Sequence, residues 1–591
     1  MRIASTRSAG RKRRVPETSS PESVLGEPIP SQTGSGLDIS KRFWVIASVC
    51  ILLLAAFLRF YDLDLVPLHH DEGVNGNFLV RLVREGFYHY DPANYHGPTL
   101  YYFAALFPRL LRVLFGVQTQ NSVGLTTEAI RFVPALFGVA TVALVLTLRR
   151  NLGTLATLSA AALLAISPGA VYLSRYFIHE SLFVFFTLGV VVAGLRYYER
   201  ANPIYLLIAA LSAALLFATK ETAIISAIVL LLALVLTYVY RLLRTRAANS
   251  GAPKRKKGRA DSRAQQSGFV ARAGGPPNIA LWLVAALVVF LAVNVLLYSS
   301  FFKNFPKGVW DAIKTFEFWT KTGKEAHVHP LSTYVWWLLL QESPVLLLGA
   351  IGAMVSVVRS TRAFALFSAL WAFGLLTAYS LIAYKTPWLV LNFIVPLALC
   401  SGYAVQWIYE GLTRFEVGRG ARLLVLGFVL LIVTGLGPGL MRAYTEEKVH
   451  WKTFIPGYQT FDLNFRNYDN DNQYYVYVYA HTRRDLVKMV DEIKRIAQRT
   501  HQGNQTGITI VAPEYWPLPW YLRDYNRVGY FGRMSQSTEP IIVATQGQAA
   551  EVETMFGDRY QQVHSGSNPA GTFSLRPGVE LMLFTRRELV K

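Results

Sequence analysis

Charged side chains are scarce in this chain of 591 residues. Asp, Glu, Lys and Arg make up 16% of it, whereas soluble domains average about a quarter. This deficit excludes an ordinary soluble enzyme, and the high apolar content excludes a disordered chain. Cysteine is nearly absent as well, since Cys50 and Cys400 are the only two. Both lie inside apolar runs, so no disulfide framework is expected.

Apolar residues take the place of the missing charge. They make up 52% of the chain and raise the mean hydropathy to +0.30. They gather in runs of about 18 to 24 residues, the length that a helix needs to cross a bilayer. The runs predict an α-helical polytopic membrane protein with about 11 transmembrane helices, at about 43–61, 129–148, 153–172, 181–198, 203–219, 221–240, 279–301, 333–358, 363–383, 388–408 and 421–441.

The net charge of +22 suggests nucleic-acid binding, but its distribution favours a membrane orientation instead. Residues 1–42 hold 8 Lys/Arg and 4 Asp/Glu, and residues 241–272 hold 10 Lys/Arg and 1 Asp. Both segments flank apolar runs, as the positive-inside rule expects of cytoplasmic segments. We therefore expect a disordered basic cytoplasmic tail at 1–42, a basic cytoplasmic linker at 241–278, and no nucleic-acid partner.

The first span, 43–61, is expected to be an uncleaved signal anchor, because the apolar stretch begins only near Phe43. Eleven spans with the N-terminus inside would place 62–128, 302–332 and 442–591 outside the plasma membrane. The acidic bias of 62–100 agrees with this orientation.

Residues 442–591 differ in kind from the rest of the chain. Strands are predicted at 474–480, 508–512, 540–544 and 580–584, and a helix at 484–499 has apolar residues at helical spacing. Strands that alternate with helices predict a C-terminal extracytoplasmic α/β domain with a mainly parallel sheet.

The first external loop carries the strongest candidate site. His69, His70, Asp71 and Glu72 follow one another just past the first span. Ionisable groups at a membrane face suggest function, and a carboxylate there can deprotonate an acceptor hydroxyl or amine. The alternative is a solvated loop with ordinary surface charges. We favour catalysis by Asp71 and Glu72, because small residues follow them rather than a run of charge.

Two further external turns, at 174–180 and 384–388, lie between apolar spans. Arg175 could hold a phosphate through two hydrogen bonds, and Glu180 could orient a sugar hydroxyl. Lys385, between Tyr384 and Trp388, suits an anionic lipid phosphate. In the alternative reading the basic side chains snorkel to lipid headgroups and the aromatic ones form an interfacial belt. Lys220 and Glu221 are a weaker case, for which an internal ion pair is the simpler explanation.

Two more features leave alternatives open. The histidines and carboxylates of the external turns could supply ligands for a divalent cation, but no metal-binding spacing supports it. The loop 302–332 has Trp310, Ile313, Phe316 and Trp319 at helical spacing. It predicts an amphipathic interfacial helix, either a lid over a lipid-linked substrate or a plain support.

The order of these motifs resembles the glycosyltransferase C superfamily. Within it, the chain is similar to glycosyltransferase family 39, which includes protein O-mannosyltransferases and the lipid A aminoarabinose transferase. It looks most like a prokaryotic flippase-activity-associated subfamily. The motifs are HHDEG, YHGPTLYY, SRYFIHE, ATKET and YKTPW, between residues 69 and 388, with a looser match at EYWPLPWY.

This resemblance implies a glycosyltransferase C-like membrane domain at 43–441. It would transfer a sugar from a polyprenyl-phosphate donor on the outer face of the membrane, with inversion of the anomeric centre. The acceptor class, whether lipid, glycan or protein, does not carry over. The implied catalytic residues are Asp71 and Glu72. The substrate-binding residues are expected to be His70, His96, Arg175, His179, Glu180, Lys220, Tyr384, Lys385 and Trp388. The competing hypothesis is a non-catalytic flippase or flippase-accessory protein, for which broken midplane helices and charges within spans would be typical.

Overall fold

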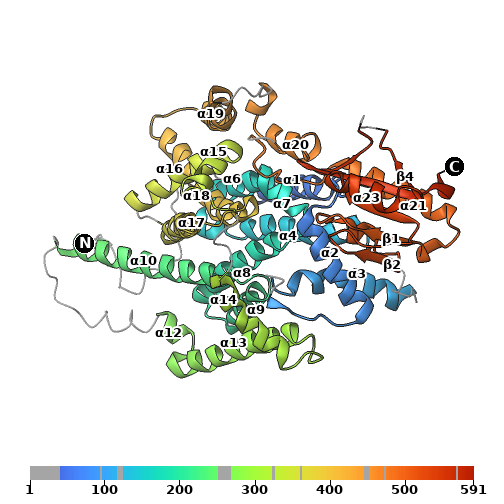
Figure 1. Cartoon of the computed structure of the whole chain (residues 1–591). Helices are drawn as coiled ribbons and strands as arrows, with labels where there is room; N and C mark the ends of the chain where they lie inside the picture. The colour runs from blue at the N-terminus through green and yellow to red at the C-terminus, as the bar shows by residue number, and fades with distance from the viewer. Residues whose placement is uncertain are drawn as a thin grey trace, which may run out of the picture.

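The computed structural model describes residues 40–92, 96–115, 124–250, 268–321, 327–359, 362–444, 451–471, 474–566 and 570–590. A large helical body adjoins a smaller sheet domain, which is drawn in red in Figure 1. The predicted tail falls outside the described residues over 1–39, and the predicted linker at 241–278 does so over 251–267.

Eight helices in the described part of the chain are long and apolar enough to cross a membrane, and ten spans result if each of two bent helix pairs counts as one. The eight are α1 (Lys41–Phe60), α4 (Thr127–Leu146), α8 (Glu180–Arg200), α10 (Ala223–Ser250), α13 (Gly275–Tyr298), α17 (Ala363–Leu381), α18 (Leu391–Thr413, preceded by η5, Pro387–Val390) and α19 (Arg419–Tyr444).

The two bent pairs are α6 (Thr154–Ala165) with α7 (Pro168–Ser174), at 57°, and α15 (Thr333–Gln341) with α16 (Ser343–Arg359), at 114°. The helix α9 (Pro203–Phe217) is apolar but has only 15 residues, fewer than a typical span. A polytopic helical fold is therefore as predicted, while the count of eleven and the cytoplasmic N-terminus stay predictions.

The helix α18 forms the centre of the helical body and packs against α6, α16 and α17. Most of its side chains are buried. Glycines allow this close packing: a Cβ on Gly402 would collide with the carbonyl oxygen of Ala156 in α6. The turns at 174–180 and 384–388 are thus carried on closely packed helices.

Shorter helices cover the membrane body. They include α2 (His70–Glu85), α3 (Thr99–Phe115), α5 (Arg149–Leu152), α12 (Phe269–Arg272) and α14 (Lys307–Lys321). The predicted amphipathic helix within 302–332 is α14, and Trp310 and Ile313 on it are 60% and 56% exposed. Exposed apolar side chains of this size suit a membrane interface.

The segment 451–482 belongs to the helical body rather than to the sheet domain. It contains η6 (Trp451–Phe454) and α20 (Tyr458–Phe465), and the latter packs on α7. The predicted strand at 474–480 is wrong, since the described residues there form turns. Tyr474, Tyr477 and Val478 are buried in the same apolar core as the membrane helices. Their tertiary burial overrides the β propensity of the sequence.

The sheet domain begins with α21 (Arg484–Arg499), the helix that was predicted there. Its strands are β1 (Gly507–Ile510), β2 (Arg527–Tyr530), β3 (Ile541–Thr545), β4 (Tyr560–Val563), β5 (Phe573–Arg576) and β6 (Val579–Arg586), with the short helices α22 (Leu518–Tyr521) and α23 (Ala549–Phe556) and the 3₁₀ turns η7 (Gly503–Gln505), η8 (Gln546–Gln548) and η9 (Arg587–Leu589).

The strand order is β2-β1-β3-β6-β4, with β5 paired to β6. The strand β1 runs parallel to β2 and β3, in register Ile508 to Ile541, whereas β6 runs antiparallel to β3, β4 and β5. The predicted mainly parallel sheet is therefore wrong, and the sheet is mixed. The cause is the sequence after β3, because β5 and β6 form a hairpin around Gly578, whose φ is +80°. Hairpin strands are necessarily antiparallel.

The sheet domain is held against α2 by a seam of small and aromatic residues. A Cβ on Gly73 would collide with Pro517, and one on Gly76 would lie 2.6 Å from Cε3 of Trp520. The hydroxyl of Tyr521 also accepts a hydrogen bond from the backbone N–H of Leu68, at 2.9 Å. The glycines of the first loop and the aromatic motif at 514–521 thus fit one another.

Candidate active site

The site begins at the N-terminus of α2, where His69 is the N-cap residue. Its Nδ1 accepts a hydrogen bond from the backbone N–H of Asp71, and its own backbone N–H donates to Oε2 of Glu72. Its Nε2 lies 3.1 Å from the carbonyl oxygen of Tyr479. A carbonyl only accepts, so this contact is a hydrogen bond donated by Nε2 of His69. This reciprocal cap fixes the first turn that carries both carboxylates.

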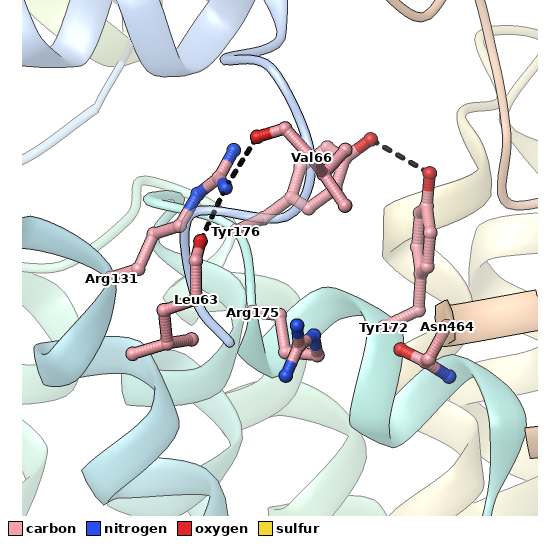
Figure 2. A pocket seen from close by; sticks show the side chains of 7 residues that line it. All are labelled: Leu63, Val66, Arg131, Tyr172, Arg175, Tyr176 and Asn464. Carbon is pink, nitrogen blue, oxygen red and sulfur yellow. Dashed lines mark hydrogen bonds between the residues drawn. The ribbon is translucent and has the colours of Figure 1, made fainter. Parts of the chain in front are cut away.

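Glu72 is fully buried and forms an ion pair with Arg131 of α4, whose Nε and Nη2 lie 2.7 and 2.6 Å from its two oxygens. The backbone N–H of Phe177 also donates to Oε1, at 2.7 Å. Arg131 donates further to the carbonyls of Leu63 and Val66, as Figure 2 shows. Such a two-bond pair orders its surroundings, so Glu72 joins α2, α4 and the turn at 174–180.

Asp71 has a contrasting environment although it is the neighbour of Glu72. It is only half-buried, and within the described residues its carboxylate accepts no hydrogen bond. A general base needs a free carboxylate that a reacting proton can approach. Of the two predicted catalytic residues, Asp71 has the geometry of a base and Glu72 that of an anchor.

Three stretches far apart in sequence meet around the ring of His69. Its centroid lies 5.7 Å from that of Tyr176, 6.1 Å from that of Trp388 and 5.8 Å from that of His481. The hydroxyl of Tyr176 is hydrogen-bonded to Nδ1 of His481, at 2.6 Å. The turns at 174–180 and 384–388 and the first loop therefore form one site.

Arg175 lies in this site, but its donors face the backbone. Its Nη1 and Nη2 donate to the carbonyls of Tyr61 and Asp62, at 2.6 and 2.7 Å, and it stacks on the ring of Phe465. It therefore closes the C-terminal end of α1. With Arg131, it also lines a cavity of about 10 Å³ (Figure 2), enough for roughly one water molecule. Phosphate binding by Arg175 would require it to release a carbonyl, and stays a prediction.

Lys385 is similarly engaged. Its Nζ donates to the carbonyls of Ile382 and His329, at 2.6 and 3.1 Å, and the side chain is buried. It holds the turn at 384–388 against residues 327–329, and its role as a phosphate ligand also stays a prediction.

Tyr384 connects the two halves of the site. Burial raises its pKa to about 12, and the charges of Lys220, Asp71 and Glu180 all act on it. Its ring packs edge-on against His327, with 5.3 Å between centroids. Tyr384 also pairs with Val328 in an isolated β-bridge, so the turn at 384–388 is held against residues 327–329.

The remaining predicted residues form that polar cluster. Lys220 pairs with Glu180 at 2.7 Å, so an internal ion pair is present, although its partner is not Glu221. Glu221 instead lies 3.3 Å from Nδ1 of His96, whose ring packs edge-on against His179. Burial lowers the pKa of His179 well below its usual value, so this histidine is neutral.

The glycine of the YHGPTLYY motif explains how this cluster assembles. A Cβ on Gly97 would collide with the carbonyl of Ala218, and the Gly97 N–H donates to the carbonyl of Thr219. His96 and Lys220 are paired across this contact. The glycine thus allows the backbone of the first loop to reach the hairpin between α9 and α10.

His70 lies at the outer rim, beside the sheet domain. Its ring centroid is 6.1 Å from that of Trp516, and burial is the main cause of its lowered pKa. Among the described residues, no group of three or more His, Cys, Asp or Glu side chains is arranged to hold a metal ion. The residues that are present therefore do not support the divalent-cation alternative.

Sequence reasoning missed Arg131, Tyr176, Tyr479 and His481. Arg131 could have been found, because an arginine inside a predicted span needs a partner. The other three gave little signal, since Tyr479 lies inside the stretch predicted as a strand and His481 directly follows it, and Tyr176 lies beside the charged Arg175 in the turn at 174–180.

Comparisons with known proteins agree with the fold. A sequence model of the family described as dolichyl-phosphate-mannose-protein mannosyltransferase matches residues 96–252. No curated protein matches the chain. The structure of ArnT from Cupriavidus metallidurans is similar with a TM-score of 0.58 and 14% identity, over 91% of this chain and 97% of that one.

A second ArnT structure, bound to undecaprenyl phosphate, gives a TM-score of 0.57 and 13% identity, over 92% and 98% of the two chains. The Archaeoglobus fulgidus oligosaccharyltransferase, tethered with an acceptor peptide, gives 0.50 and 13%, over 91% and 74%. The predicted resemblance to the family of protein mannosyltransferases is thus found by the sequence model over residues 96–252, and at these identities the structural likeness concerns the fold. The finer likeness to the flippase-associated subfamily stays a prediction.

Proposed function

We propose that this chain is a membrane glycosyltransferase that takes a sugar from a polyprenyl-phosphate donor at the extracytoplasmic face. The observation that carries the proposal is the free, half-buried carboxylate of Asp71 on a rigid first turn. The fold supports it, because it is shared with ArnT, which was solved with undecaprenyl phosphate.

In the proposed reaction, Asp71 accepts the proton of an acceptor hydroxyl or amine. The acceptor atom then forms a bond to the anomeric carbon while the bond from that carbon to the phosphate oxygen breaks. The electron pair of the broken bond stays on polyprenyl phosphate, and the proton on Asp71 is later released to water. A single displacement inverts the anomeric centre.

The capped helix contributes to this step by fixing the position of Asp71. The ion pair of Glu72 with Arg131 keeps that turn fixed, so that Asp71 is held in position before the reaction.

The leaving phosphate requires positive charge. Arg175 and Lys385 remain our candidates, because carbonyl contacts can be exchanged for a phosphate oxygen that binds cations more strongly. His70, His96, His179, Glu180, Lys220, Tyr384 and Trp388 are proposed to bind the sugar or the phosphate around them.

The competing proposal, a flippase or flippase-accessory protein, is favoured by the two bent helix pairs, since transporters use discontinuous helices. The test uses the purified full chain in nanodiscs with a synthetic polyprenyl-phosphate sugar. Release of the sugar to water or to an acceptor supports the transferase. No release with any donor, together with movement of the lipid across vesicles, would favour the flippase.

A further inference from the structure

A row of aromatic rings extends from the sheet domain to the first turn of α2. Tyr530 lies 5.1 Å from Tyr515, Tyr515 lies 5.8 Å from Trp516, and Trp516 lies 6.1 Å from His70, between ring centroids. All four side chains are partly exposed. His70 is the chain neighbour of Asp71, so the row ends beside the proposed base.

The row starts at the edge of the sheet. Tyr530 is the last residue of β2, which is the outermost strand and pairs only with β1. The next residue, Phe531, is 50% exposed. The row therefore runs from the edge strand of the sheet domain to the first turn of α2.

An ion pair accompanies the aromatic row. Glu514, next to Tyr515 in the chain, pairs with Arg576 at the end of β5, and their side chains are 47% and 19% exposed. The charges of both residues act on His70. A cationic hydrogen-bond donor, Arg576, and an anionic acceptor, Glu514, thus lie beside the rings.

We propose that this row, Tyr530–Tyr515–Trp516–His70 with the Glu514–Arg576 pair, binds a saccharide acceptor and leads it to Asp71. A sugar offers C–H faces, which pack on the electron-rich faces of aromatic rings, and hydroxyl edges, which need donors and acceptors together. A lipid chain would have no use for the ion pair, and a phosphate would be repelled by Glu514. This inference rests on the proposed transferase function and names its acceptor class.

Trp516 also belongs to the contact between the sheet domain and α2. Variants that test saccharide binding must therefore leave this contact intact. Trp516 and Pro517 pack on Gly73, so their replacement would also disturb docking. Tyr530 lies at the far end of the row and contributes to the sheet-domain core. Tyr530→Leu removes the ring but keeps an apolar side chain, and Tyr530→Phe keeps the ring. Tyr525→Leu is the matched control, because Tyr525 packs on the same core outside the row.

The test titrates the full chain in nanodiscs with neutral tetrasaccharides of glucose, mannose and N-acetylglucosamine and with a serine-containing hexapeptide, followed by saturation-transfer NMR. We expect at least one saccharide to bind. Its dissociation constant should rise about 3- to 10-fold in Tyr530→Leu, the loss expected for one aromatic contact, and stay close to wild type in Tyr530→Phe and Tyr525→Leu.

Three results would overturn the inference: no saccharide binds, only the peptide binds, or Tyr530→Leu and Tyr525→Leu weaken binding equally. Donor cleavage by the wild-type chain without saccharide is measured in parallel. Its absence would remove the proposed function, whereas its presence without saccharide binding would remove only the acceptor site.

Discussion

Two neighbouring carboxylates have opposite surroundings at the N-terminus of α2. The oxygens of Glu72 are occupied by Arg131 and by backbone N–H groups, whereas Asp71 is open. The sequence shows two adjacent acids and cannot distinguish them, because the partner of Glu72 lies 59 residues away. Burial and pairing at a distance decide their roles, and the predicted pair becomes one proposed base and one positioning residue.

The anchor can be tested by stability. Glu72→Gln leaves the guanidinium of Arg131 buried without its counter-charge, which typically costs about 3–5 kcal/mol of unfolding free energy. We expect a large fall in the thermal midpoint of the purified chain. The double variant Glu72→Gln with Arg131→Met should be more stable than Glu72→Gln alone, because it removes the unpaired charge. Equal stability of Glu72→Gln and wild type would contradict the anchor.

At the scale of elements, the first turn of α2 depends on a neighbouring helix in the sheet domain. Gly73 and Gly76 lie on one face of α2, three residues apart, and α22 packs directly on them. The sequence shows these glycines but not why a larger residue would not fit there. The aromatic residues that occupy the space of a side chain lie more than 400 positions later.

The seam predicts a measurable effect of one methyl group. Gly76→Ala would place a Cβ 2.6 Å from Trp520, and such overpacking costs about 1–3 kcal/mol. We expect faster protease cleavage between the two domains and lower transferase activity. Gly194→Ala is the control, because a Cβ there has open space. If both variants resist protease like wild type, α22 does not pack on Gly76 as described.

The buried His481, in the segment 474–482, should make the thermal stability of the chain depend on pH. Burial lowers the pKa of His481 well below its usual 6.5. Below about pH 6.5, the unfolded chain therefore binds a proton at His481 that the folded chain does not. The contribution of this histidine to the free energy of unfolding is complete above that pH and is lost as the pH falls. We expect the thermal midpoint to drop between about pH 7.5 and about pH 5.5, and to drop less in His481→Gln. His179 contributes equally to both proteins, so an equal drop in both would remove His481 from this role.

At the scale of the whole molecule, the sequence predicted those elements whose structure depends on residues close together in the chain. Apolar runs located the membrane helices, and α21 begins and ends as its helical spacing indicates. The first loop and the turns at 174–180 and 384–388 were each singled out from the sequence as candidate sites. The sequence did not predict where Arg175 and Lys385 point, because their carbonyl partners Tyr61 and His329 lie far away in the chain. The buried segment 474–480 was mispredicted for the same reason, whereas the mixed sheet was missed because the β5–β6 hairpin at Gly578 was not recognised.

The most direct test of the account is the rate of a single turnover in the Asp71→Asn variant. Asparagine has the shape of aspartate but cannot accept the acceptor proton. The account predicts that donor cleavage in nanodiscs falls about 10²- to 10⁴-fold, while Glu85→Gln at the other end of α2 keeps the wild-type rate. A wild-type rate in Asp71→Asn would contradict the central claim that this carboxylate is the base.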